Sequence, residues 1–277
     1  MAGWGIGWVN LKILSAYINE YELLFFRNVL AIIVLIFILI YIKKSFYVNL
    51  RSLLIIITAS IMMVAYVKFS FLGTKLGTAS LGGALISTLV PIITFIINAL
   101  ISKQYISKNE IIALCLGTMG VAMMLNIFSF SLNEILSIHN VYYVLASFVW
   151  SVLSIISAID KSTSPVILTF YIHIVSTFIT AILFVDFNSI EYTKFDGIFY
   201  INLLCLSLIT TAFATTIYFI GTDKLGAKKT SSFILLTPFF AILFSVLFLN
   251  EQISFFIIVG CILTTVAVII LNSTKKI

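Results

Sequence analysis

The sequence predicts an all-α integral membrane protein with ten transmembrane helices, arranged as two inverted five-helix repeats. Its 277 residues are 62% hydrophobic and only 9% charged, whereas soluble domains carry about 25% charged residues. Nearly every segment between polar breaks reaches the roughly 20 residues that a helix needs to cross a bilayer. Strand-length alternation of polar and apolar residues is absent, which argues against a membrane barrel.

The polar breaks divide the chain into ten apolar segments, which we expect to be the ten helices. They lie at about 2–18, 22–42, 52–72, 78–101 and 110–128 in the first half, and at 140–159, 165–185, 197–220, 229–249 and 253–272 in the second. The first segment has about 17 residues, the lower limit for crossing. It looks clipped at its start, which indicates either an upstream start codon or a shortened copy.

An internal repeat supports the division into two halves. Residues 75–126 and 224–272 are variants of one pattern that can be aligned on Pro91 and Pro238. Internal repeats are typical of transporters whose substrate site lies where the halves meet. We therefore expect one repeat over 1–130 and a second over 138–277.

The distribution of basic residues predicts the topology. With the N-terminus in the cytoplasm, eleven Lys and Arg residues fall in inward-facing breaks, and only Lys75 and Lys194 face outward. This bias follows the positive-inside rule and places both termini in the cytoplasm. Because five helices per half is an odd number, the halves are inverted relative to each other, which is the usual basis of alternating access.

Other function classes find little support in the sequence. Cys115, Cys205 and Cys261 all fall inside apolar segments, so they predict no disulfide framework. The net charge of +6 is explained by the membrane-flanking breaks and does not call for a nucleic-acid partner. The sequence contains no metal-ligand cluster and no glycine-rich phosphate loop. We therefore expect no cofactor and no enzymatic activity.

Several short motifs carry a family resemblance. Trp4 and Trp150 occupy equivalent places in the halves, a Phe-Arg pair ending at Arg27 opens the second helix, and each proline is followed thirteen residues later by Gln104 or Glu251. Together they resemble the EamA-type members of the drug/metabolite transporter superfamily, although Gln104 departs from the usual glutamate. The resemblance implies a secondary transporter, often an exporter, of amino acids, small metabolites or drugs. It also implies a central cavity lined by the first, third and fourth helices of each half.

Four ionisable residues within the segments are candidates for a role in transport, because such residues are costly in a membrane. Lys12 and Lys68 either contact the substrate or snorkel to the interface. Arg27 is expected to orient the second helix. His173 is a conceivable proton relay, or a neutral imidazole bonded within the helix bundle. Apart from Glu22 and Glu110 at the starts of their segments, the segments contain no Asp or Glu. The absence of an intramembrane carboxylate favours exchange or downhill export over carboxylate-based coupling.

Aromatic residues and prolines complete the candidate site. The aromatic residues on cavity segments could form an amphipathic wall for an organic solute, or an interfacial belt. They are Trp4, Trp8, Tyr66, Trp150 and Tyr218. Pro91 and Pro238 each remove one helical hydrogen bond and are interpreted as paired hinges.

These observations predict a secondary transporter, an exporter or exchanger of amino acids or related carboxylated metabolites. Multidrug or lipophilic-cation efflux is the first alternative, and a truncated non-transporting remnant or scaffold is the second. The expected partners are the small-molecule solute and the lipid bilayer. One chain already contains both halves, so a monomer suffices, and a homodimer is compatible with the sequence. The expected location is the cytoplasmic (inner) membrane of a bacterium.

Overall fold

The computed structural model describes residues 1–77, 79–103, 105–124, 138–249 and 255–273, and every regular element in these ranges is helical. The first half contains α1 (Ala2–Leu14), α2 (Glu20–Tyr41), α3 (Leu50–Leu76), α4 (Ala79–Ser102) and α5 (Lys108–Met124). The second half begins with α7 (Ile138–Ile159) and α8 (Pro165–Leu183), and a short 3-10 turn, η2 (Tyr192–Lys194), follows in the next loop.

Two rods in the second half change helix type along their length. The first runs from α9 (Gly197–Cys205) through the π-helix η3 (Leu206–Ala214) into α10 (Thr215–Leu225). The second runs from α11 (Ala227–Ser232) through the 3-10 turn η4 (Phe233–Leu236) into α12 (Thr237–Leu249). The last helix is α13 (Phe255–Ser273).

The described helices lie on segments that the sequence predicts to be helical. Within the described residues, six helices are long and apolar enough to cross a membrane, among them the rod Gly197–Leu225. The count of ten spans and the cytoplasmic placement of both termini remain predictions.

The expected first span, 2–18, is longer than the helix that forms there. α1 ends at Leu14 after 13 residues, about 20 Å of helix, which is less than the roughly 30 Å of a bilayer core. The chain then turns, and Asn19 starts α2 because its side chain accepts the backbone N–H groups of Tyr21 and Glu22. The Glu22 carboxylate accepts the Asn19 N–H in return, which completes a capping box.

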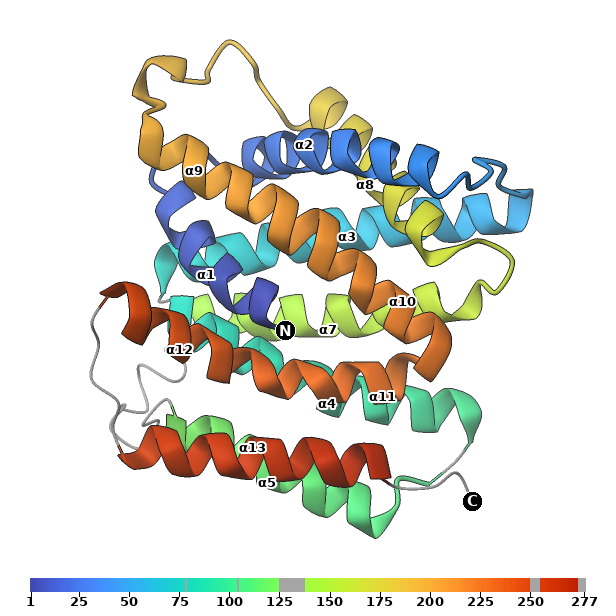
Figure 1. The fold of residues 1–277 in the computed structure, drawn as a ribbon, viewed down its shortest axis with the longest axis vertical. Coiled ribbons are helices and arrows are strands. Elements are labelled where there is room, and N and C mark those ends of the chain that lie inside the picture. The colour runs from blue at the N-terminus through green and yellow to red at the C-terminus, as the bar shows by residue number, and fades with distance from the viewer. Residues whose placement is uncertain (78, 104, 125–137, 250–254, 274–277) are drawn as a thin grey trace.

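Equivalent helices of the two halves lie together in the stack (Figure 1). At one end of the stack α2 packs against α8, and at the other end α5 packs against α13. Between these pairs the halves exchange partners, since α1 packs mainly on η3, α9 and α12, whereas α7 packs mainly on α3 and α4. We call α1, the α9–η3–α10 rod and α12 the α1 bundle, and α3, α4 and α7 the α7 bundle.

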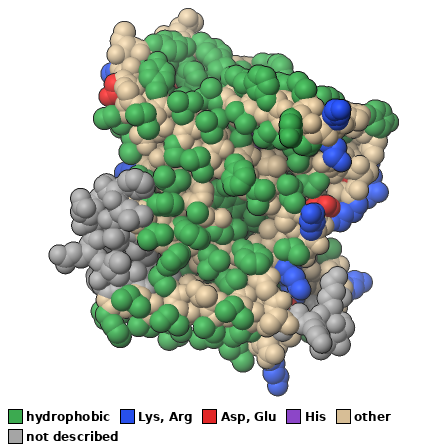
Figure 2. Space-filling model, viewed as in Figure 1, with side chains coloured by type: hydrophobic (Ala, Val, Ile, Leu, Met, Phe, Trp, Pro, Cys, Tyr) green, Lys and Arg blue, Asp and Glu red, His purple; other side chains and the backbone are tan. Residues whose placement is uncertain are grey.

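The outer surface is apolar. Figure 2 shows a face covered largely by hydrophobic side chains, with most of the visible Lys and Arg gathered along one edge. Phe37, Ile182 and Phe213 each expose more than 60% of their surface. Contiguous apolar surface of this extent is rare on soluble monomers and is suited to contact with lipid chains. The arrangement therefore agrees with a multi-pass membrane protein.

The two prolines occupy different local structures. Pro91 lies inside the continuous helix α4, whereas Pro238 is the second residue of α12, directly after the 3-10 turn η4. The second half therefore changes helix type where the first half continues as one helix. The hinge role of the two residues remains a prediction.

Candidate functional site

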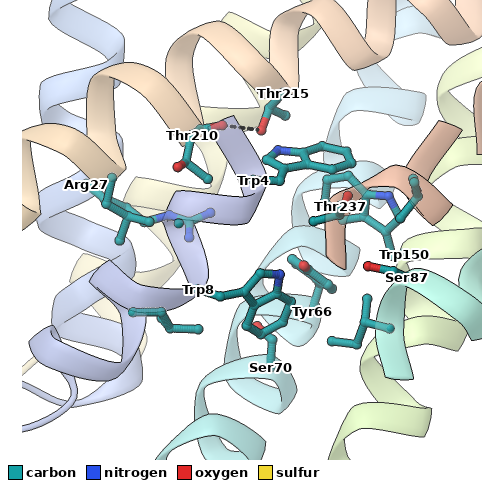
Figure 3. Close-up of a pocket in the computed structure, with 15 residues that line it drawn as sticks. Trp4, Trp8, Arg27, Tyr66, Ser70, Ser87, Trp150, Thr210, Thr215 and Thr237 are labelled. Atoms are coloured by element: carbon teal, nitrogen blue, oxygen red, sulfur yellow. Dashed lines mark hydrogen bonds between the residues drawn. The ribbon is translucent and has the colours of Figure 1, made fainter. Parts of the chain in front are cut away.

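A small cavity lies where the α1 bundle meets the α7 bundle (Figure 3). Its volume is about 70 Å³, whereas sites for small organic ligands usually measure about 300–1,000 Å³. In this conformation the space between the two bundles therefore holds no more than a few water molecules. A larger solute requires the two bundles to separate.

The first, third and fourth helices of both halves contribute to the cavity wall, as the family resemblance implied. α1 and α2 supply Trp4, Gly7, Trp8, Leu11 and Arg27; α3 and α4 supply Tyr66, Ser70, Ile86 and Ser87; and the second half supplies Trp150, Leu206, Thr210, Thr215, Ile234 and Thr237. Arg27 was not expected here, because the resemblance did not place the second helix at the cavity.

Arg27 is the charged residue on this wall. Its side chain points from α2 toward the cavity (Figure 3), and its Nε is buried with no hydrogen-bond partner among the described residues. Glu22, one turn earlier, already accepts the Asn19 N–H, and no ion pair of the described residues involves Arg27. A buried charge without a counterion is strongly unfavourable. The guanidinium therefore creates a site for an anionic group.

Hydroxyl groups on the wall present oxygen lone pairs to the cavity. Five serine and threonine side chains line it, and each donates its own hydrogen within the protein. The bonds run from Ser70 to the Val67 carbonyl (3.2 Å), Ser87 to the Gly83 carbonyl, Thr210 to the Gly3 carbonyl (2.6 Å), Thr215 to the Thr210 carbonyl (3.1 Å) and Thr237 to the Met1 sulfur (3.6 Å). Because their hydrogens are used, these groups can only accept hydrogen bonds from a solute.

Four aromatic rings form one cluster beside the polar groups. The Trp4 ring lies edge-on to Trp150 at 5.2 Å between centroids and 4.9 Å from Tyr218. Tyr66 lies 4.5 Å from Trp150. The buried Nε1 of Trp150 makes no hydrogen bond of good geometry with the described residues, and the Tyr218 hydroxyl lies close to it. The Tyr218 hydroxyl instead pairs with Ser154 at 2.8 Å.

The prolines also affect the cavity wall. A proline has no backbone N–H, so the carbonyl four residues earlier loses its helical partner. For Pro91 this carbonyl belongs to Ser87, and for Pro238 it belongs to Ile234. Both Ser87 and Ile234 line the cavity. Pro91 thus leaves the Ser87 carbonyl without its helical partner, whereas the Ile234 carbonyl accepts the Thr237 N–H within the 3-10 turn η4.

The other charged candidates lie away from the cavity. Lys12 donates hydrogen bonds to the carbonyls of Thr74 and Gly77, both at 2.8 Å. Lys68 lies 5.8 Å from the centroid of the Tyr21 ring. His173 is fully buried on α8, and neither of its ring nitrogens has a hydrogen-bond partner among the described residues. The structure therefore brings together Trp4, Trp8, Tyr66, Trp150 and Arg27 on the cavity wall, and Tyr218 contacts Trp4 and Trp150.

A second, apolar hollow of about 500 Å³ adjoins the cavity. It shares Trp4 with the cavity and is lined by Tyr218 and by apolar residues of the α9–η3–α10 rod such as Ile209, Phe213 and Ile217. Phe213 and Ile217 are both more than half exposed, so the hollow lies on the surface that would face lipid. Trp4 and Tyr218 separate this hollow from the polar cavity.

The serines and threonines of the cavity were largely missed by the sequence analysis. Residues 206–214 have the composition of an ordinary apolar helix, and nothing in that sequence distinguishes a π-helix. In the structure Leu206–Ala214 forms a π-helix, in which backbone N–H groups bond carbonyls five residues earlier. The side-chain hydroxyls of Thr211 and Thr215 also donate to carbonyls five residues earlier. The wider turn contributes to the position of Thr210 on the wall. Within the described residues, no three His, Cys, Asp or Glu side chains converge on a metal site.

Comparison with known proteins identifies the family. No curated protein sequence matches the chain. A solved structure described only as "Crystal structure of protein" is similar over 98% of this chain and 95% of its own, with a TM-score of 0.75 and 14% identity, which shows a shared fold. The sequence profile of the EamA-like transporter family matches residues 1–126 and again residues 138–273. The chain therefore belongs to the EamA-like transporter family, a family of membrane transporters within the drug/metabolite transporter superfamily.

Proposed function

We propose that this protein is a carrier of small carboxylated solutes, such as amino acids or related metabolites, which it exports or exchanges by alternating access. The observation that carries the proposal is the guanidinium of Arg27, which faces the cavity without an ion-pair partner among the described residues. A guanidinium binds a carboxylate through two parallel hydrogen bonds. A carboxylated solute would therefore supply the counterion that Arg27 lacks.

The rest of the wall suits the remainder of such a solute. The hydroxyl oxygens and the Ser87 carbonyl, which Pro91 deprives of its helical partner, can accept hydrogen bonds from an ammonium or hydroxyl group. The faces of Trp4, Tyr66 and Trp150 offer apolar contact and cation–π attraction. A solute with a carboxylate at one end and an ammonium group or an apolar body at the other matches these two regions.

Transport requires the cavity to enlarge and to open on each side in turn. The inverted repeat supports this proposal, because two conformations related by exchange of the halves' shapes open to opposite sides. The described residues of the cavity wall include no carboxylate. This composition favours exchange, or export down a solute gradient, over proton or sodium coupling at an acidic residue.

Counterflow in proteoliposomes tests the proposal. Labelled amino acids, a nucleoside and a lipophilic cation would be compared for the unmodified protein, Arg27→Gln and Arg27→Lys. Arg27→Gln should lower exchange of the carboxylated solute about tenfold or more, because a hydrogen bond to a charged group contributes about 1.5–3 kcal/mol and 1.4 kcal/mol corresponds to about tenfold. Arg27→Lys should fall between the two, since it retains the charge but loses the paired geometry.

Arg51→Gln is the matched control, because Arg51 is exposed on the first turn of α3 and should transport normally. Carboxylate exchange that survives Arg27→Gln, in protein that remains monodisperse, would contradict the proposal.

Efflux of lipophilic cations is the second candidate function. The apolar hollow of about 500 Å³ beside Trp4 and Tyr218 favours it, because a lipophilic solute could enter from the bilayer through this hollow. The positive charge of Arg27 opposes it. Exchange of the lipophilic cation alone, undiminished by Arg27→Gln, would support this candidate and displace the first.

A further inference from the structure

We infer that Lys12 and Lys161 are gating residues, each of which holds the α1 bundle against the α7 bundle at one end of the cavity. The inference rests on the proposed alternating-access carrier and names the contacts that must break for the cavity to open. It is carried by two sets of hydrogen bonds, one in each half of the chain, which end at equivalent positions of the repeat.

The two lysines contact equivalent positions of the repeat. The third helix of the first half ends in the sequence Thr74-Lys75-Leu76-Gly77, and the third helix of the second half ends in Asp223-Lys224-Leu225-Gly226. Lys12 Nζ donates to the Thr74 carbonyl at 2.8 Å, and Lys161 Nζ donates to the Asp223 carbonyl at 2.6 Å. Each lysine precedes its acceptor by 62 residues. The acceptor positions are therefore equivalent, whereas the donors are not, since Lys12 lies eight residues after Trp4 and Lys161 eleven residues after Trp150.

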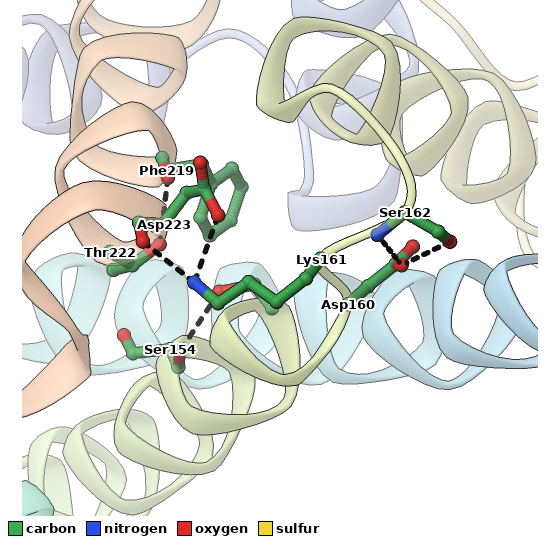
Figure 4. Close-up of polar contacts among 8 residues, drawn as sticks. Ser154, Asp160, Lys161, Ser162, Phe219, Thr222 and Asp223 are labelled. Atoms are coloured by element: carbon green, nitrogen blue, oxygen red, sulfur yellow. Dashed lines mark hydrogen bonds and ion pairs between the residues drawn. The ribbon is translucent and has the colours of Figure 1, made fainter.

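Each contact joins one bundle to the other. Lys12 lies on α1 and binds the end of α3, which belongs to the α7 bundle. Lys161 lies two residues after the end of α7 and binds the end of α10, which belongs to the α1 bundle (Figure 4). The cavity lies between these two bundles. Separation of the bundles at either end must therefore break the contact at that end.

The two contacts lie at opposite ends of the bundles, because they lie near opposite ends of α3. At the first turn of α3 the Ser52 hydroxyl lies 2.9 Å from the hydroxyl of Ser162, the residue after Lys161. At its last turn α3 offers the Thr74 carbonyl to Lys12. The 27 residues of α3 extend about 40 Å. The Lys12 contact and the Lys161 contact thus belong to opposite membrane faces.

The contacts differ in their chemistry. Lys12 binds only backbone carbonyls, those of Thr74, Lys75 and Gly77. Lys161 binds the Asp223 carboxylate at 2.9 Å in addition to the carbonyl. A cation at a helix C-terminus is favourable in both cases, and the second contact gains an ion pair. The side chains of this pair are 59% and 33% exposed, so salt should weaken it.

The test is the accessibility of a cysteine on the cavity wall. Cys115, Cys205 and Cys261 would be replaced by Ser, and Ser87→Cys introduced as the reporter. A membrane-impermeant thiol reagent would be applied to each face of oriented vesicles without any transported solute. Lys12→Met should accelerate labelling from one face only, and Lys161→Met from the opposite face only. The expected acceleration is about two- to fivefold, the population shift that an exposed charged contact supplies.

Matched controls come from the repeat itself. Lys75→Met and Lys224→Met remove exposed lysines at equivalent positions beside the two acceptors and should leave both labelling rates unchanged. Asp223→Asn keeps the backbone acceptor, so it should accelerate labelling less than Lys161→Met does and from the same face. In the protein that retains both lysines, added salt should accelerate labelling from the face of the Lys161–Asp223 ion pair more than from the opposite face.

Acceleration from the same face by both lysine variants, acceleration by neither, or equal acceleration by the controls would overturn the inference. Because labelling needs no solute, its outcome is independent of the outcome of the transport assay. If the two lysine variants accelerate labelling from opposite faces but no carboxylated solute is exchanged, the gating inference stands and the proposed solute is rejected. Normal exchange with unchanged labelling would reject the gating residues alone.

Discussion

Tyr143 connects three helices of the α7 bundle, and its contacts with two glycines give a sharp test of the packing. Tyr143 on α7 is fully buried. A Cβ atom added to Gly73 on α3 would lie 2.6 Å from its ring, and one added to Gly82 on α4 would lie closer still. Cβ atoms essentially never approach other atoms so closely, so an alanine at either glycine must displace the ring. The positions of α3 and α4 relative to α7 therefore depend on the absence of these side chains.

The expected cost of Gly73→Ala is about 1–3 kcal/mol, the usual range for overpacking a well-filled interior. The gain in helix propensity on replacing glycine by alanine, about 0.5–1 kcal/mol, offsets part of it. At about 2–4 °C per kcal/mol, the apparent melting temperature in detergent should fall by several degrees. Gly197→Ala is the control, because nothing lies within 4 Å of a Cβ atom there, and it should not lower the melting temperature.

A double substitution distinguishes a ring clash from a general disturbance. Tyr143→Leu removes the ring atoms that the new methyl group would meet, so Gly73→Ala should cost little once Tyr143 is Leu. The two changes should differ from additivity by about 0.5–3 kcal/mol, as residues in contact do. Thermal unfolding of the four purified proteins measures this difference. Additive losses would refute the argument that the Tyr143 ring is what Gly73 accommodates.

Two further predictions concern the loops. Burial tends to raise the pKa of the Asp160 carboxyl, but hydrogen bonds from Ser52 and from the Ser162 hydroxyl and N–H outweigh burial and hold this pKa at about 2. A carboxyl group with a lowered pKa stabilises the fold at pH values above its ordinary pKa of 3.8, and this contribution is lost as the pH falls toward 2. Asp160→Asn should therefore flatten the decline of the melting temperature between pH 5 and pH 2.5. An unchanged decline would contradict this argument. Gly226 has φ 83° and ψ 156°, a region essentially restricted to glycine, so Gly226→Ala should cost about 1–3 kcal/mol. Gly77→Ala should avoid this cost because Gly77 has φ −114°, and equal melting temperatures for the two variants would contradict the backbone argument.

The overall fold could be predicted because hydrophobic length and polar breaks determine which segments become helices. The ends of helices depended on local hydrogen bonds that the segment lengths ignore. α1 stops at Leu14 rather than at residue 18 because the chain turns there and the Asn19–Glu22 capping box begins the next helix. The spacing of that box is visible in the sequence, so this boundary could have been found. The π-helix could not, because residues 206–214 have the composition of an ordinary apolar helix.

The candidate site was predictable in its aromatic part and less so in its charged part. Trp4, Tyr66 and Trp150 fall on segments that the family resemblance assigns to the cavity, and the structure places all three on its wall. Segment position could not rank Lys12 against Arg27, because both lie in apolar helices. The two side chains differ in where their charged groups lie. The Lys12 ammonium extends to the end of α3, whereas Arg27 lines the cavity. Gln104 and Glu251 lie outside the described residues.

The two halves are related by the repeat, but differences between them make the two sides of the cavity chemically unlike. Arg27 aligns with Tyr171 in the second half, and the Tyr171 hydroxyl donates to the Phe46 carbonyl at 2.9 Å, away from the cavity. The guanidinium therefore has no counterpart in the second half, while the aromatic partners of Trp4 come from α7 and α10. A solute with a single carboxylate would then bind in one orientation, with this group toward α2 and its remainder toward Trp150. In the proposed carrier, this single arginine would hold the carboxylate in the same orientation whichever face is open.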